Sequence, residues 1–219
     1  MAESIRFKYQ TFEIGNSDFH IRSLRDNQQF SDDQGVAENL GISSANWPLF
    51  GIMWASGEVL ARLMVDEELK GRSILEVGCG LGLASLVLNR RLANITATDQ
   101  HPEAAGFLEK NTRLNDDRDI PFIRTGWAEP CSRLGKFDLI IGSDLLYERN
   151  HADLLAAFIE EHAASKCEVV LIDPGRKHHG KFTRRLQGFG FDSVKEKSQG
   201  TDAMLKSFAG FILRYTRKN

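Results

Sequence analysis

The sequence predicts an α/β fold, in which helices cover both faces of a mainly parallel β-sheet. After residue 46, short apolar runs alternate with stretches in which apolar residues recur at helical spacing. Two further apolar runs, at residues 191–194 and 205–215, follow each other with no helix between them. Because a parallel return needs a long crossover, we expect these last two strands to pair antiparallel. The pattern therefore predicts a doubly wound, mixed sheet.

A strand, a tight turn and a helix are predicted at residues 74–88, which read ILEVGCGLGLASLVL. The apolar run at the start is typical of a buried strand, and Gly78, Gly80 and Gly82 then interrupt it. Glycine has no Cβ and readily adopts positive φ, so backbone N–H groups in such a turn can approach a ligand. The amino end of the following helix favours a carboxylate or a phosphate.

Two acidic residues narrow the choice of ligand. Asp99 follows a second apolar run at residues 94–98, where a carboxylate can accept both hydroxyls of a ribose. Glu76 precedes the glycines, and its charge suits the ammonium of an amino acid and repels a pyrophosphate. No Lys-Ser or Lys-Thr pair follows the glycines, and Ala84 takes the last glycine position of the dinucleotide pattern, which tolerates alanine.

Residues 1–46 are polar and are predicted to form an extension before the α/β domain of residues 47–219. Apolar residues alternate along two short runs with a turn cluster at residues 15–18 between them, which predicts a β-hairpin. Residues 31–45 predict a mobile loop. This loop is either a plain extension or a flap that closes over the ligand or shapes the substrate entrance.

An apolar stripe over residues 49–65 predicts a helix that leads directly into the glycine strand. Trp54 lies early in this helix. An aromatic residue in a helix most often packs in the core, but the place of Trp54 in the chain also makes it a candidate site residue. For Trp47, just before the helix, we favour the core.

A helix at residues 103–115 and a third strand at residues 120–124 come next. Proline is well tolerated in a first helical turn, which suits Pro102 at the start of this helix. Trp127 follows the third strand, and it either stacks against a ligand or packs as an ordinary tryptophan.

The fourth predicted strand, residues 137–141, leads into Asp144 and Tyr147. Ligands gather at the carboxyl ends of strands in open α/β sheets, so both side chains are candidate site residues. If the chain turns helical at this point, their spacing of three places them on one face. The structural alternative is an aspartate that caps a helix beside a packed tyrosine.

The rest of the chain predicts a helix at residues 153–165, a fifth strand at residues 168–172, a basic helix and the two closing strands. A polar loop at residues 198–202 separates the closing strands. The basic residues are His178, His179, Lys181, Arg184 and Arg185. The two histidines lack the spacing of a metal-binding pair, and we interpret the face as solvated or as a docking patch for an acidic partner.

Charge and cysteine content limit the class of protein. The chain has 28 basic and 30 acidic residues, a net charge of −2, which does not indicate a nucleic-acid or membrane-surface binder. Its three cysteines are odd in number and unclustered, which argues against a disulfide framework or a zinc site. No apolar run approaches the roughly 20 residues of a membrane helix, and no signal core is evident. We expect a cytoplasmic protein.

The segment Glu76-Val-Gly-Cys-Gly-Leu-Gly82, with Asp99 after the next strand, resembles motif I of the class I S-adenosylmethionine-dependent methyltransferases. Trp54, Trp127 and Asp144-Leu-Leu-Tyr147 extend this resemblance to the small seven-β-strand protein-lysine N-methyltransferases. That family acts on calmodulin-type, chaperone-type and electron-transfer-flavoprotein substrates.

The resemblance implies a Rossmann-like sheet of seven strands in the order 3-2-1-4-5-7-6, with an antiparallel last strand. A shorter similarity, Asp173-Pro-Gly-Arg176, indicates the branch that modifies the electron-transfer flavoprotein β subunit.

The resemblance also implies a cofactor, S-adenosylmethionine, and no metal. Asp144 would capture and orient the acceptor ammonium, and Tyr147 would line the lysine channel. The implied cofactor-binding residues are Gly78 and Gly80 close to the cofactor, Asp99 at the ribose, Glu76 near the methionine ammonium, Trp54 at the methionine end, Trp127 at the adenine, and Ser143 beside the sulfonium or adenine.

The sequence thus predicts a monomeric methyltransferase that acts on a protein lysine by in-line displacement, with no nucleic-acid or membrane partner. A small-molecule amine methyltransferase stays open, because an Asp-x-x-Tyr pair can orient many amines. A nucleic-acid methyltransferase is disfavoured, because enzymes acting on exocyclic base amines usually carry Pro-Pro-aromatic where this chain has Leu-Leu-Tyr147. A non-catalytic module of the same fold would need neither the glycines nor Asp99.

Overall fold

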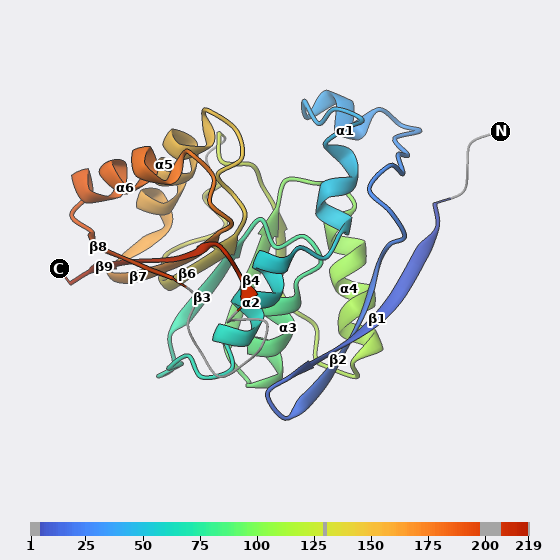
Figure 1. Ribbon diagram of the computed structural model, residues 1–219, viewed down its shortest axis with the longest axis horizontal. Coiled ribbons are helices and arrows are strands. Elements are labelled where there is room, and N and C mark those ends of the chain that lie inside the picture. The colour runs from blue at the N-terminus through green and yellow to red at the C-terminus, as the bar shows by residue number, and fades with distance from the viewer. Residues whose placement is uncertain (1–4, 129–130, 198–206, 219) are drawn as a thin grey trace.

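The computed structural model describes residues 5–128, 131–197 and 207–218. Its centre is a seven-stranded sheet in the order β5-β4-β3-β6-β7-β9-β8 (Figure 1). The strands are β3 Ser73–Val77, β4 Asn94–Asp99, β5 Phe122–Arg124, β6 Phe137–Ser143, β7 Ala163–Asp173, β8 Asp192–Lys197 and β9 Phe211–Arg217. Neighbours from β5 to β7 are parallel, and β9 is antiparallel to both β7 and β8. Counted from β3, this is the predicted order 3-2-1-4-5-7-6, which is confirmed.

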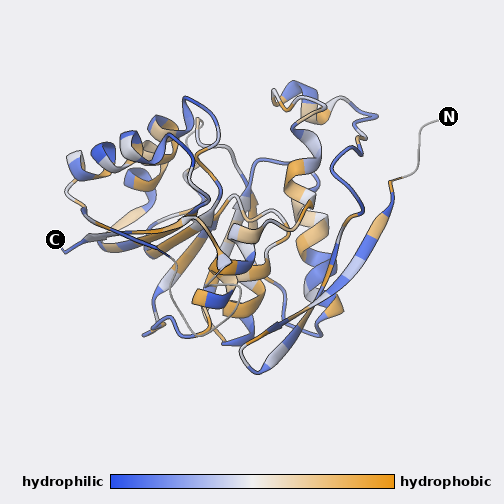
Figure 2. Ribbon diagram, in the orientation of Figure 1, coloured by the Kyte–Doolittle hydropathy of each residue, from blue (hydrophilic) through white to orange (hydrophobic). Residues whose placement is uncertain are grey.

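Helices cover both faces of the sheet. Strand β3 has alternating side chains, so Ile74 joins the hydrophobic cluster of α2, α3 and α4, and Leu75 joins that of α5 and α6. The bounds are α2 Ala55–Leu63, α3 Leu83–Arg90, α4 Ala104–Leu114, α5 His151–His162 and α6 His179–Gly188. A strand covered on both faces reads as a continuous apolar run, and Figure 2 shows the central strands as largely hydrophobic.

The predicted hairpin is present as β1 Phe7–Ile14 and β2 Ser17–Leu24, which form a separate two-stranded sheet beside α4 (Figure 1). Two asparagines of the α4 region bind its backbone. The Oδ1 atom of Asn111 accepts the Arg22 N–H at 2.8 Å, and Asn115 both accepts from and donates to the His20 backbone. The apolar side of the hairpin belongs to the same cluster as α2, α3 and α4.

The helix predicted at residues 49–65 is wrong in its first half. A 3-10 helix, η1 Trp47–Gly51, comes first, residues 52–54 are not helical, and α2 begins only at Ala55. At Gly51 the chain packs closely against the hairpin, because a Cβ at this position would lie 2.6 Å from the Leu24 side chain. Trp54 is therefore the extended N-cap residue of α2 and does not lie inside the helix.

The segment at residues 31–45, predicted as a loop, contains a short helix, α1 Val36–Asn39. The carboxylate of Asp32 accepts hydrogen bonds from the Ala37 and Glu38 N–H groups at 3.0 and 2.8 Å. These bonds satisfy donors at the start of α1, which explains why so short a helix forms.

Other predicted boundaries also differ, and β7 begins at Ala163 and not at residue 168. Helix α5 ends at His162 and not at residue 165, because Ala163 turns to extended geometry and pairs with Phe137 of β6. Strand β9 begins at Phe211 and not at residue 205. A Cβ on Gly210 would lie 2.3 Å from the Asp173 carbonyl oxygen, so the chain enters β9 through a close glycine contact. The loop predicted at residues 198–202 lies outside the described residues. No helix within the described residues is long and apolar enough to cross a membrane.

The attachment of the hairpin gives a first prediction. Asn111 is fully buried, and its Nδ2 also donates to the Leu81 carbonyl at 3.2 Å, so Asn111→Ala leaves buried backbone groups without partners. We expect the free energy of unfolding in urea to fall by about 1–3 kcal/mol. The control Lys110→Ala, at an exposed position of the same helix, should change it by less than about 0.5 kcal/mol. Equal effects of the two substitutions would contradict this role.

Candidate active site

A cavity of about 760 Å³ opens at the carboxyl ends of β3, β4 and β6. This is the sheet edge at which open α/β folds hold ligands. All of the site residues predicted from the sequence line it, namely Trp54, Glu76, Gly78, Gly80, Asp99, Trp127, Ser143, Asp144 and Tyr147. The fold therefore brings together residues as far apart in the chain as Trp54 and Tyr147, which are separated by 93 positions.

The glycine turn between β3 and α3 forms the floor of the cavity. Gly78, Gly80 and Gly82 all have positive φ, at 61°, 54° and 74°. At Gly80 the restriction is also steric, because a Cβ would lie 2.9 Å from the Phe50 carbonyl oxygen of η1. Glycine is needed at this position for both reasons, and its lack of a side chain leaves the backbone accessible from the cavity.

Asp99 ends β4 and fixes the turn from the opposite side. Its Oδ2 accepts the Gly80 N–H at 2.9 Å, and its Oδ1 accepts the His101 N–H at 2.8 Å. Burial raises the pKa of this carboxyl, although the two backbone bonds act in the opposite direction. Each carboxylate oxygen retains a further lone pair, so the side chain can still accept the hydroxyls of a ribose.

Glu76, at 4% exposure, holds the start of α3 as well as lining the cavity. Its Oε2 accepts the Ser85 N–H at 2.9 Å and the Ser85 hydroxyl. Burial raises the pKa of Glu76 to about 7, and the bonds to Ser85 oppose the shift. A cation placed beside this carboxyl would favour its charged form.

The rings of Trp127, His151 and Tyr147 form a row along one wall of the cavity. The His151 ring packs edge-on against Trp127 at 5.0 Å and against Tyr147 at 4.5 Å between centroids. Its Nδ1 lies 2.8 Å from the Leu145 carbonyl oxygen. Burial, followed by the negative charge of Glu148, raises the pKa of Tyr147 to about 12, so its hydroxyl remains a hydrogen-bond donor at neutral pH. Sequence reasoning missed His151, although it lies at the start of the helix that follows the site strand.

The chain does not turn helical after β6, so Asp144 and Tyr147 do not share a helix face. Asp144 has a φ of 53°, its N–H donates to the Ile172 carbonyl at 2.8 Å, and α5 starts only at His151. Leu145 packs in the turn so tightly that a Cβ on Gly78 would lie 2.6 Å from it. Both predicted side chains nevertheless line the cavity, through this irregular turn.

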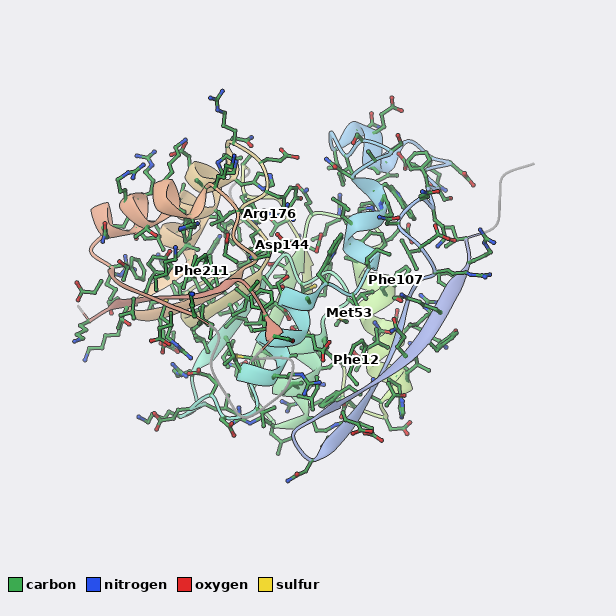
Figure 3. The ribbon with its side chains drawn as sticks, in the orientation of Figure 1. Phe12, Met53, Phe107, Asp144, Arg176 and Phe211 are labelled. Atoms are coloured by element: carbon green, nitrogen blue, oxygen red, sulfur yellow. The ribbon has the colours of Figure 1, made fainter. Side chains whose placement is uncertain are left out.

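Arg176 is a site residue that sequence reasoning did not select. Its Nε and Nη2 donate to Oδ1 and Oδ2 of Asp144 at 2.9 and 3.0 Å, and Figure 3 shows the two side chains together. The arginine follows β7 and lines the same cavity. In the sequence, Arg176 is part of the short Asp173-Pro-Gly-Arg176 similarity, but that similarity predicted no role for the arginine.

Of the remaining candidates, Trp54 is exposed at the cavity, whereas Trp47 and Cys79 are buried. Trp54 is 38% exposed, and its Nε1 donates to the Leu49 carbonyl at 2.9 Å, which holds the indole at the cavity wall. Trp47 is 1% exposed and packs edge-on against Phe50, so it is a core residue. Burial raises the pKa of the Cys79 thiol well above its usual range, which suits a packed side chain and not a nucleophile.

The N-terminal segment also contributes to the cavity wall. Leu40, Gly41, Ile42 and Asn46 line it, and the Asn46 Nδ2 donates to Glu148 Oε1 at 3.4 Å. This contact joins the extension to the turn after β6. The position suits a flap, and closure of the segment over a ligand stays a prediction.

The chemical groups that line the cavity suit an organic cation that carries a ribose. Four carboxylates, Glu76, Asp99, Asp144 and Glu148, line it together with aromatic rings and an accessible glycine backbone. These features fit the sulfonium nucleoside that the sequence resemblance implies. Within the described parts of the chain, no three His, Cys, Asp or Glu side chains cluster so that they could hold a metal ion.

A family model described as lysine methyltransferase matches residues 39–188. The electron transfer flavoprotein beta subunit lysine methyltransferase of Rattus norvegicus is 32% identical over 133 residues, which cover 59% of this chain and 51% of that protein. Protein N-lysine methyltransferase METTL21A of Danio rerio is 32% identical over 141 residues, 59% of this chain and 63% of that protein. The matched part of the chain thus spans about half to two thirds of the length of these curated relatives.

Solved structures with the same fold include the ribosomal protein L11 methylase of Lactobacillus delbrueckii subsp. bulgaricus. Its TM-score is 0.59 at 23% identity, over 75% of this chain and 79% of that chain. The magnesium protoporphyrin IX methyltransferase of Synechocystis, solved with bound SAM, has a TM-score of 0.56 at 19% identity. The match covers 73% of this chain and 76% of that chain. At these identities the similarity shows the fold, which is the predicted Rossmann-like methyltransferase fold.

The raised pKa of Glu76 gives a prediction about stability. A carboxyl whose pKa rises from 4.5 to about 7 on folding stabilises the protein while protonated, and this contribution is lost as pH rises through that range. Glu76→Gln cannot ionise, so its free energy of unfolding relative to wild type should increase between pH 4.5 and 7, by about 3 kcal/mol. Urea unfolding at several pH values measures the difference. A difference that does not vary with pH would contradict the assignment.

Proposed function

Because the chain belongs to the lysine methyltransferase family, we propose that it transfers a methyl group from S-adenosylmethionine to the side-chain amine of a protein lysine. One observation carries the proposal. The glycine turn, Asp99 and the Asp144–Tyr147 pair all line one cavity, where a cofactor site and an acceptor site would adjoin. The relatives named for lysine methylation of proteins support the choice of acceptor.

The cavity residues divide between the two ends of the cofactor. Asp99 would accept the ribose hydroxyls, and the backbone at Gly78 and Gly80 would approach the nucleoside. Glu76 would lie near the methionine ammonium, whose charge would favour the ionised carboxylate. Trp54 would lie at the methionine end, Trp127 along the adenine, and Ser143 beside the sulfonium or adenine. When bound, the cofactor supplies an electrophilic methyl group on a sulfonium.

The protein chiefly has to align the acceptor. A lysine with its usual pKa near 10.4 is neutral in fewer than about one molecule in a thousand at pH 7, and only the neutral amine has a lone pair. In the proposed transfer, the amine nitrogen would form a bond to the methyl carbon as the sulfur–carbon bond breaks, with that electron pair remaining on sulfur. The ammonium loses its proton to water before this step. Asp144 and the protonated Tyr147 would orient the nitrogen in line, which is a proximity effect.

A labelling experiment tests the proposed reaction. The purified protein is incubated with methyl-labelled S-adenosylmethionine and a protein extract from cells that lack it, and methyllysine is sought in the acid hydrolysate. Label that survives nuclease and is lost with protease would support the proposal. Label in nucleic acid or in small amines would replace it with the corresponding alternative. If calorimetry detects no cofactor binding, a non-catalytic module is indicated.

We further propose that the protein acts as a monomer in the cytoplasm. Its three cysteines, Cys79, Cys131 and Cys167, are buried and free, which suits a reducing compartment. Light scattering after size exclusion would test the monomer, and fractionation of cells would test the compartment.

The assignment of Asp99 to the ribose predicts an effect on affinity. Asp99→Asn removes the charge that strengthens the ribose bonds, each worth about 1.5–3 kcal/mol when charge-assisted. We expect the affinity for S-adenosylhomocysteine, measured by calorimetry, to fall about ten-fold or more. Asp138→Asn is the matched control, because Asp138 binds Ser73 near the opposite end of the central strands. Unchanged affinity in Asp99→Asn would refute the ribose assignment.

The assignment of Asp144 to the acceptor predicts the converse. Asp144→Asn should lower the rate of methyl transfer by about a hundred-fold or more and leave the affinity for S-adenosylhomocysteine nearly unchanged. Asp153→Asn, at an ion-paired position on the surface of α5, should affect neither. Loss of cofactor binding in Asp144→Asn would mean that the residue belongs to the cofactor site.

A further inference from the structure

A second, smaller cavity of about 410 Å³ adjoins the first. It is lined by Trp54, Ala55, Ser56, Asp144, Pro174, Gly175, Arg176 and Phe208. Of these residues, Trp54, Asp144 and Arg176 also line the larger cavity. The two cavities therefore adjoin at the Asp144–Arg176 ion pair, and a chain that entered through the smaller one would meet the cofactor site at this pair.

The pair already satisfies the charge of Asp144. Both carboxylate oxygens accept from the guanidinium, at 2.9 and 3.0 Å, which is the two-point geometry that makes arginine–carboxylate pairs strong. The Asp144 side chain is 13% exposed and that of Arg176 is 44% exposed. The guanidinium already occupies both carboxylate oxygens, and an enclosed carboxylate without any cation would be costly. A cationic acceptor that binds Asp144 therefore has to take the place of the arginine.

The backbone of Arg176 is fixed, whereas its side chain is not enclosed. The Asp173 carboxylate, at 2% exposure of the residue, accepts the N–H groups of Gly175 and Arg176 at 2.7 Å each. The Arg176 carbonyl also lies 2.7 Å from the His179 Nδ1. The side chain can thus swing from Asp144 toward solvent while the loop after β7 keeps its position.

The walls of the smaller cavity suit an aliphatic chain. Trp54, Pro174 and Phe208 are apolar, and Asp144 supplies a carboxylate beside them. A lysine has this same sequence of properties, since it carries a compact ammonium on a flexible four-carbon stem. Arginine presents the same charge to Asp144 from within the protein.

We propose that the smaller cavity receives the acceptor lysine, and that Arg176 occupies the ammonium position on Asp144 until the lysine displaces it. The inference rests on the proposed function and adds to it an entry path and a positioning residue. An acceptor without a cationic end gains nothing at Asp144 and leaves the ion pair intact, so Arg176 also discriminates against neutral side chains.

The test uses n-butylammonium, a stand-in for the end of a lysine side chain, with protein saturated with S-adenosylhomocysteine. Arg176→Met removes the competing cation, so the probe should bind about ten-fold more tightly than to wild type in titrations followed by NMR. Arg176→Lys keeps the competing charge and should stay close to wild type. Adding Asp144→Asn to Arg176→Met should abolish the gain. The neutral probe n-butanol should bind all four proteins alike.

Arg185→Met is the matched control, because Arg185 forms its ion pair with Asp153 on the surface of α6. Equal or weaker binding of n-butylammonium by Arg176→Met, with S-adenosylhomocysteine still bound, would overturn the inference and leave the proposed function intact. If S-adenosylhomocysteine does not bind to wild type, the proposed function itself fails. Thermal unfolding of each variant separates loss of the pair from loss of the fold.

Discussion

The site depends on the close approach of three elements to one glycine turn. A Cβ on Gly80 would collide with the Phe50 carbonyl oxygen of η1, and a Cβ on Gly78 or Gly82 would displace the side chain of Leu145 after β6 or of Leu108 in α4. The bare glycine turn therefore lets η1 approach its backbone and lets the two leucine side chains pack against it. Asp99 binds the same turn through the Gly80 N–H, so the carboxylate and the turn are positioned together.

Negative charge is the second organising feature of the cavity. Glu76, Asp99 and Asp144 are each supported by donors from other elements, namely Ser85, backbone N–H groups and Arg176. Burial raises the pKa of Glu76 and Asp99, so a cationic ligand would recover part of the cost of their ionisation. A sulfonium cofactor and a lysine acceptor are both cationic, which makes one negatively charged cavity suitable for both.

The family resemblance predicted the strand order, and local signals in the sequence predicted nine of the residues that line the cavity, but not His151 or Arg176. Glycines in a turn, an acid at a strand end and an aromatic beside it can be recognised from neighbouring residues alone. The errors arose where distant packing decided the geometry. The helix predicted at residues 49–65 is interrupted after Gly51, which packs against Leu24 of the hairpin. The Asp144 N–H donates to the Ile172 carbonyl in a turn that is not helical.

The sequence by itself determined the sheet, its antiparallel end and the chemical types available at its carboxyl edge, since alternation and spacing follow from the geometry of single strands and helices. The tertiary structure alone decided which side chains pair there. Arg176 forms an ion pair with Asp144, and His151 lies between Trp127 and Tyr147. The N-terminal segment near residue 42 forms part of the cavity wall. Such contacts depend on how separate segments pack, and no periodicity along the chain encodes that packing.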